Sequence, residues 1–362
     1  MRASFKIFRV FGIDVEVHIS LLILLVLLIY AFSVSPFPYG FANFPLSERI
    51  ILSSMAAVGL FASILAHELG HSLVARRYGV RIRGIMLFIF GGVAMMDELP
   101  KKPREELVVA ISGPATSFGI AVVSALLSSI PVAELSAFFL LFGYLNFILA
   151  IFNLIPAFPM DGGRILRSFL AEKRSYAEAT KIAAEIGRAL AIFMAIFGIF
   201  TNPWLILIAL FVYIGANEEE RLVLLENVLG RVRVADVMNT EVVTVTPEMT
   251  VSEVIDLILK TKHLGFPVVE GERLVGIITL HDIIGVEPEE RVGNIMSREV
   301  VAVSPNQSAF EAFKIMSEMG IGRLPVVEHG RVVGIVSRSD LMRIKEILEA
   351  LEVMCWRKRG SS

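Results

Sequence analysis

The 362-residue chain has a single cysteine, Cys355, and only 19% of its residues are charged. One cysteine excludes an internal disulfide framework and is typical of a reducing compartment. The charged fraction lies below the roughly 25% of ordinary soluble domains. With a formal net charge of −2, the chain has no basic excess, so its composition predicts no nucleic-acid partner. More than half of the residues, 55%, are hydrophobic.

The N-terminus lacks the pattern of a cleaved secretory leader. Such a leader combines a short basic region, an apolar core and a small-residue cleavage site. Here Asp14 and Glu16 interrupt the approach to the first apolar run, residues 18–34. We therefore expect this run to be an uncleaved membrane span.

Long apolar runs are confined to residues 1–217, whereas residues 218–362 alternate charged and hydrophobic residues like a soluble protein. A helix needs roughly 20 residues to cross a bilayer. By that length we expect six spans, near residues 18–34, 50–77, 105–130, 135–156, 180–200 and 203–217. The predicted fold is a polytopic α-helical membrane domain at 1–217, a linker at 218–232 and a soluble α/β part.

The distribution of basic residues predicts the orientation of these spans. Lysines and arginines gather before the first span, between the second and third, and between the fourth and fifth. The opposite connections offer only Arg49. The positive-inside rule then predicts a protein of the cell membrane with both termini and the soluble part in the cytoplasm.

A His-Glu-x-x-His pattern, formed by His67, Glu68 and His71, lies inside the second expected span. Ionisable groups are costly there. Residues four apart share one face of a helix, so both histidines can bind one metal ion with the glutamate beside it. The alternative is a pair of interior histidines that line a polar pore, but it leaves Glu68 unexplained. The pattern therefore favours a metal site.

A catalytic zinc site uses three protein ligands and keeps one position open. His18 is one candidate for the third ligand, but at the start of the first span it is better interpreted as an interfacial residue. The other candidate is Asp161, which follows Pro156 and Pro159 and precedes two glycines. Proline ends a helix and glycine permits a tight turn. An aspartate that only forms this turn is the alternative, but its place near the cytoplasmic side, level with His71, favours ligation.

With these two motifs the chain resembles the site-two proteases, which are intramembrane zinc metalloproteases. The similarity covers about residues 10–217 and includes a second motif, Asn-x-x-Pro-x-x-Pro-x-Asp-Gly. Its implied substrate is a membrane protein with a transmembrane helix, cut in or near that helix. The resemblance implies zinc binding by His67, His71 and Asp161, acid/base catalysis by Glu68, and substrate contact by Asn153. An asparagine in a membrane helix can instead bond only a neighbouring helix.

Two further segments concern the surroundings of this site. Residues 84–96 are apolar, rich in strand-forming residues and broken by two glycines. We expect a small membrane-associated β-hairpin there, whose edge can pair with an extended substrate by β-augmentation. A re-entrant hairpin that only packs against helices is the alternative. The small residues at 112–117 predict close helix packing.

Residues 233–283 and 291–341 repeat one another at a spacing of 58 residues. Tandem units of this length bury one face against each other. The copies resemble cystathionine-β-synthase (CBS) domains, which gives a CBS pair at 233–345 and a tail at 346–362. The resemblance implies an adenine nucleotide, ATP or AMP, contacted by Thr279, Asp282, Ser337 and Asp340, and it allows a homodimer through the CBS domains. A dimerisation module that binds no ligand is the alternative.

Two classes of function remain. The first is an intramembrane zinc metalloprotease that carries out regulated intramembrane proteolysis under control of its CBS pair. The second is a CBS-regulated transporter or channel whose His/Glu/Asp cluster lines an ion path. Transporters often contain inverted repeats, and the sequence shows none. Two histidines and a carboxylate can also hold iron(II), but the glutamate beside them favours hydrolysis.

Overall fold

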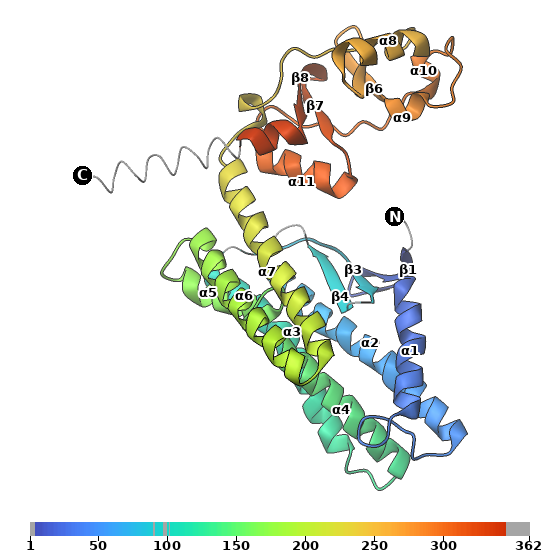
Figure 1. The fold of residues 1–362 in the computed structure, drawn as a ribbon, viewed down its shortest axis with the longest axis vertical. Helices are drawn as coiled ribbons and strands as arrows, with labels where there is room; N and C mark the ends of the chain where they lie inside the picture. Colours follow the sequence, from blue (N-terminus) through green and yellow to red (C-terminus); the bar gives the residue numbers. More distant parts are fainter. Residues whose placement is uncertain (1–3, 90, 97–99, 101, 345–362) are drawn as a thin grey trace, which may run out of the picture. The chain divides into compact units, whose positions relative to one another are not determined.

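A computed structural model describes residues 4–89, 91–96, 100 and 102–344. The expected tail at 346–362, with Cys355, lies outside the described residues. The chain divides into two compact units, Met1–Arg221 and Leu222–Ser362, which are described separately (Figure 1).

The first unit is built mainly from helices. Four of them, α2, α3, α4 and α6, are long and apolar enough to cross a membrane, which confirms a polytopic membrane domain. The first expected span is a helix of 15 residues, α1, and the sixth is the first half of α7, which continues through three glutamates at 218–220. The bounds are α1 Ser20–Val34, α2 Leu46–Arg77, α3 Pro103–Leu127, α4 Ala133–Asn153, α5 Asp161–Ala171, α6 Tyr176–Phe200 and α7 Pro203–Leu229.

Local sequence explains where several of these helices begin and end. Proline occupies the first position of α3, where its missing N–H costs nothing. Ser175 caps α6 in a reciprocal pair with Glu178, which satisfies two backbone donors. Arg76 and Arg77 occupy the last turn of α2 and stabilise the negative end of its dipole. These helices therefore carry their own start and stop signals in the sequence.

A four-stranded sheet in the order β1-β2-β3-β4 lies against the helices. Its strands are β1 Ser4–Val10, β2 Ile13–His18, β3 Ile82–Phe88 and β4 Gly91–Met96. β3 and β4 form the expected antiparallel hairpin, and β4 is an edge of the sheet. The two N-terminal strands extend that hairpin, because β2 pairs in parallel with β3 at Val15 and Ile85. The sequence alone did not predict these two strands.

The second unit consists of two α/β copies whose strands form one sheet in the order β5-β6-β8-β7. Each copy has its own hydrophobic core, centred on Val268 in the first and Val326 in the second. The repeat extends to the backbone, since Lys262 and Gly320 both end a helix with positive φ. The elements are η1 Val234–Asp236, α8 Val251–Thr261, β5 Gly265–Glu270, β6 Arg273–Thr279, α9 Leu280–Ile283, α10 Val292–Ile295, α11 Ala309–Met319, β7 Arg323–Glu328 and β8 Arg331–Ser337.

Candidate metal centre and active site

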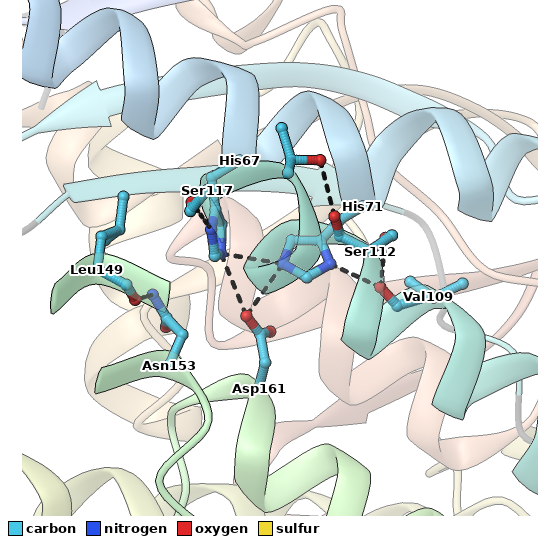
Figure 2. A network of polar contacts seen from close by, with 9 residues as sticks. His67, His71, Val109, Ser112, Ser117, Leu149, Asn153 and Asp161 are labelled. Carbon is cyan, nitrogen blue, oxygen red and sulfur yellow. Dashed lines mark hydrogen bonds and ion pairs between the residues drawn. The ribbon is translucent and has the colours of Figure 1, made fainter. Parts of the chain in front are cut away.

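Three expected metal ligands meet in the interior of the membrane domain (Figure 2). His67 and His71 lie one turn apart on α2, and Asp161 is the first residue of α5. The Oδ2 atom of Asp161 lies 3.2 Å from His67 Nε2 and 3.1 Å from His71 Nε2. The two Nε2 atoms are 3.2 Å apart. All three side chains are buried.

The donor set fits a zinc ion. Tetrahedral bonds of about 2.0 Å place neighbouring donor atoms about 3.3 Å apart, close to the observed separations. His71 Nδ1 lies 2.7 Å from the carbonyl oxygen of Val109, which can only accept, so this nitrogen carries a proton, and in the neutral ring that binds a metal Nε2 presents a lone pair. That lone pair faces a carboxylate oxygen. Two acceptor atoms this close repel each other, and a cation between them stabilises the arrangement.

The second histidine has a matching outer partner. His67 Nδ1 lies 2.9 Å from Ser117 Oγ, so each ring is held by a residue of α3 on its far side. Partners of this kind fix the orientation of metal-binding imidazoles. Sequence reasoning missed Val109 and Ser117, although the small residues at 112–117 did indicate close packing of this helix.

Gly113 explains how α3 can pack so close to the two histidine rings. A Cβ at this position would lie 2.1 Å from His71 Nε2 and 2.7 Å from His67 Nε2. The two rings therefore occupy the space that any larger residue at position 113 would fill. This glycine was not among the expected site residues.

The loop between α4 and α5 brings Asp161 to the histidines. The helix ends at Asn153, before the first of two prolines. A Cβ at Gly162 would lie 2.2 Å from the Ile155 carbonyl oxygen, and one at Gly163 would lie 2.6 Å from Phe158 N. The two glycines therefore let the loop fold back against the first turn of α5. Its first-turn carboxylate also suits the positive end of the helix.

A cavity of about 700 Å³ opens beside the three candidate ligands. Glu68, Asn153 and Pro159 line it, together with residues 91–94 of the edge strand β4. A Cβ at Gly92 would lie 2.7 Å from Glu68 Cγ, so the strand runs directly past the glutamate. Asn153 Nδ2 donates to the Leu149 carbonyl oxygen at 3.0 Å within its own helix. A potential base, the metal cluster and a strand at the edge of the sheet thus all line the same cavity.

His18, the rejected candidate ligand, lies outside this cluster. Its Nδ1 is 2.8 Å from Ser20 Oγ at the start of α1. Among the described residues, the group placed to hold a metal consists of His67, His71 and Asp161.

In the second unit, the four expected nucleotide contacts form two equivalent pairs. Thr279 donates to Asp282 Oδ2 from its backbone N and its Oγ1, both at 2.7 Å. The backbone N of Ser337 donates to Asp340 Oδ2 at 3.1 Å. Each pair caps the helical turn that follows its strand, which is a structural role in itself.

The pair formed by Ser337 and Asp340 also lines a cleft between the two copies. The first copy contributes Asn239 and His263, and the second contributes Arg323. The structure therefore places one of the two expected pairs at a concave, polar surface.

Comparison with known proteins agrees with both halves of this description. The model of peptidase family M50 matches residues 55–133 and 128–194, and the CBS domain model matches residues 234–289 and 292–346. The zinc metalloprotease MJ0392 of Methanocaldococcus jannaschii is 40% identical over 355 residues, 97% of this chain and 99% of its own length. The chain belongs to peptidase family M50. Rip3 of Mycobacterium tuberculosis is 30% identical over 371 residues, 96% of this chain and 94% of its own length.

A solved structure, the site-2 protease from Methanocaldococcus jannaschii, is 43% identical, covers 60% of this chain and 95% of its own, and has a TM-score of 0.45. Membership of family M50 confirms the resemblance seen in the sequence. This M50 protein is a zinc metalloprotease with apolar membrane helices and two CBS domains.

Proposed function

We propose that this M50 protease hydrolyses a peptide bond in or near a transmembrane segment of another membrane protein, as in regulated intramembrane proteolysis. One observation carries the proposal. Glu68 and the cluster of His67, His71 and Asp161 share a cavity among helices that are long and apolar enough to cross a membrane. This setting supports a substrate that reaches the cavity from the lipid.

His67, His71 and Asp161 would hold the zinc ion through two nitrogens and one oxygen, which leaves a fourth position for water or substrate. When bound, zinc supplies a Lewis acid that polarises the scissile carbonyl and the attacking water. Iron(II) also accepts two histidines and a carboxylate, so metal analysis of the purified protein separates the two ions.

Glu68 is the proposed acid/base. It follows a candidate ligand directly on α2 and lines the cavity. Its carboxylate takes a proton from the attacking water and returns it to the leaving amine, a role that contributes typically 10²–10⁴-fold to rate. Asn153, which also lines the cavity, is the proposed contact for the substrate backbone.

The edge strand β4 is the proposed docking site for the unwound substrate. An extended peptide can add to an exposed sheet edge through main-chain hydrogen bonds. Residues 91–94 of β4 line the cavity beside Glu68. A substrate strand paired there would pass the proposed base, which supports cleavage of an extended rather than a helical segment.

Orientation and domain roles are part of the same proposal. We assign residues 1–217 to the protease, 218–232 to a linker and 233–345 to the CBS pair. The basic residues between the spans support an orientation with both termini and the CBS pair in the cytoplasm.

The CBS pair is proposed to bind an adenine nucleotide, ATP or AMP, and to change the cleavage rate. The cleft beside Ser337 and Asp340 supports this, because His263 and Arg323 line it with groups that suit phosphate. Thr279 and Asp282 form the equivalent pair of the first copy. A homodimer through these domains that binds no ligand is the second candidate.

Glu68→Gln tests the protease proposal in full-length protein reconstituted with a membrane substrate. We expect it to lose cleavage but to keep one zinc ion, because it removes a base and leaves the ligands. His67→Ala and Asp161→Ala should lose both. Glu48→Gln, in the first turn of the same helix, is the matched control and should cleave normally. Near-normal turnover by Glu68→Gln would exclude the proposal.

Calorimetry and cleavage assays on the full-length protein test the nucleotide. ATP or AMP should change the rate severalfold, which corresponds to a coupling of about 1–3 kcal/mol. The combined variant Asp282→Ala and Asp340→Ala should lose that response. Absence of binding, or binding with an unchanged rate, would favour the ligand-free dimerisation module.

A further inference from the structure

The face of the N-terminal sheet that packs on α1 and α2 is formed by rows of side chains that cross it from edge to edge. Residues paired across neighbouring strands point to the same face. Two such rows, in the order β1 to β4, are Phe5, Val17, Leu87 and Gly92, and then Phe8, Val15, Ile85 and Ala94.

From β2 to β4 this face is covered by protein. Val15 and Ile85 are fully buried in a core that includes Leu21 of α1 and Phe61 of α2. The first row ends at Gly92, against the proposed base Glu68. One face of the sheet therefore lies against membrane helices along most of its width.

At the β1 edge the same face is uncovered. Phe5 is 63% exposed and Phe8 is 44% exposed. Adjoining large apolar side chains that stay exposed at the end of a buried row mark a surface for an apolar partner.

The opposite face of the same two strands is charged and balanced. Lys6 and Arg9 bind Asp14 at 2.6 and 2.8 Å, and Lys6 is paired across the strands with Glu16. Two cations and two anions leave this face with no net charge. This face therefore offers a partner no net charge.

The hairpin is tied to the end of α2, a helix long and apolar enough to cross a membrane. Arg76, in the last turn of α2, donates from Nη1 to the Phe11 carbonyl oxygen at 2.6 Å. β2 ends at His18 and α1 begins two residues later (Figure 1). The first turns of α1 carry the exposed apolar residues Leu22 and Ile23. Exposed apolar side chains therefore lie both on β1 and at the start of α1, the helix that follows β2 along the chain.

We propose that the β1–β2 hairpin, residues 4–18, is a lipid-binding surface. Phe5 and Phe8 insert at the boundary between headgroups and acyl chains, where aromatic side chains are favoured. The balanced charges of the other face lie toward water, so the contact depends on apolar burial and is independent of anionic lipid. Because the rows continue to Gly92, this contact also fixes the depth of the sheet edge beside Glu68.

Fluorescence quenching in vesicles tests this surface. The full-length protein carries one cysteine, so Cys355→Ser gives a background for single labels. Phe8→Cys, labelled with bimane, should lose most of its emission in phosphatidylcholine with brominated acyl chains and little to aqueous iodide. Lys6→Cys, on the opposite face of the same strand, is the matched control and should show the reverse. Replacing part of the lipid with phosphatidylserine should leave both results unchanged.

A second pair of labels guards against a local folding defect. Phe5→Cys should behave like Phe8→Cys, and Arg9→Cys like Lys6→Cys, while Leu22→Cys on α1 reports full lipid contact. Equal quenching at positions 8 and 6, or quenching of position 8 by iodide, overturns the proposal. Protection of position 8 from both quenchers also overturns it, because a second copy or a substrate then covers the face.

Discussion

Arg167 offers a sharp energetic test of how the site is held together. It lies in α5, the helix that begins with Asp161, and is only 1% exposed. Its Nε donates to Glu106 Oε1 of α3 at 2.9 Å, and its Nη1 donates to Glu219 Oε1 of α7 at 2.7 Å. The perturbation is Arg167→Met, which keeps much of the volume and removes the charge and the donors.

The same guanidinium is stacked between two rings. Its carbon lies 4.9 Å from the ring centroid of Phe158, in the loop before Asp161, and 4.7 Å from that of Tyr176 in α6. One buried cation therefore joins α3, α5, α6, α7 and the loop that leads to a candidate metal ligand. Loss of the Arg167 charge should therefore lower metal binding as well as the stability of the fold.

The magnitude follows from the burial of the partner. Glu106 is also 1% exposed, so Arg167→Met leaves its carboxylate buried without the arginine. Removing one member of a buried pair costs about 3–5 kcal/mol. At roughly 2–4 °C per kcal/mol for a unit of this size, the unfolding temperature should fall by about 6–20 °C. Glu106→Gln combined with Arg167→Met should recover a large part of this loss, because the fully buried carboxylate is then neutral and the other partner, Glu219, has 26% of its side chain exposed.

Thermal unfolding in detergent, with zinc content measured on the folded fraction, provides the assay. Arg188→Met is the matched control, since Arg188 joins α6 to Glu220 of α7 but is more exposed, with 22% of its side chain accessible. It should cost less than Arg167→Met and should keep the metal. The reasoning is refuted if the double variant is as unstable as Arg167→Met alone, since an unpaired buried charge is then not the cause.

Three further changes test separate parts of the structure. Gly113→Ala should lose tightly held zinc and cleavage, because the new Cβ displaces the histidine rings, whereas Gly119→Ala, where a Cβ meets no atom within 4 Å, should keep both by metal analysis. Burial raises the pKa of Glu219, but its arginine partner outweighs burial and holds that pKa below the ordinary 4.5. The stability that this group contributes is therefore complete above pH 4.5 and is lost as the pH falls further. In unfolding experiments, Glu219→Gln should reduce the loss of stability at acid pH. A cysteine at Arg174 should react with an impermeant reagent from the cytoplasmic face and one at Asn43 from the other face, and the reverse pattern would contradict the orientation.

The metal cluster was predictable because each of its parts has a local signature. The i,i+4 spacing of His67 and His71 requires only that α2 be helical. Asp161 is marked by prolines and glycines that end one helix and begin the next. The repeat of 58 residues likewise made the CBS pair visible without any knowledge of its contacts.

The parts that sequence reasoning missed depend on contacts between residues far apart in the chain. β2 pairs in parallel with β3, which lies far along the chain. Nothing in the residues of β2 indicates that β3 is the strand it pairs with. Arg167 was counted among the basic residues of a cytoplasmic connection, whereas the structure buries it against Glu106. Charge counting reports where arginines are frequent, but it does not distinguish a solvated arginine from one that is paired inside the protein.

Removal of the metal gives a last test, which follows from the polar atoms around it. The outer nitrogens of His67 and His71 are held by α3, so their inner nitrogens and an Asp161 oxygen converge within about 3 Å. Without a cation, these atoms must share a proton or lie unpaired in a buried space, where an unpaired polar group costs more than it would in water. A ligand that binds the folded state stabilises it by RT ln(1 + [L]/Kd). A chelator should therefore lower the unfolding temperature of the native protein and of Glu68→Gln, and should leave Asp161→Ala unchanged, because that variant has already lost the metal. An equal effect of the chelator on Asp161→Ala would show that the stabilising ion binds elsewhere.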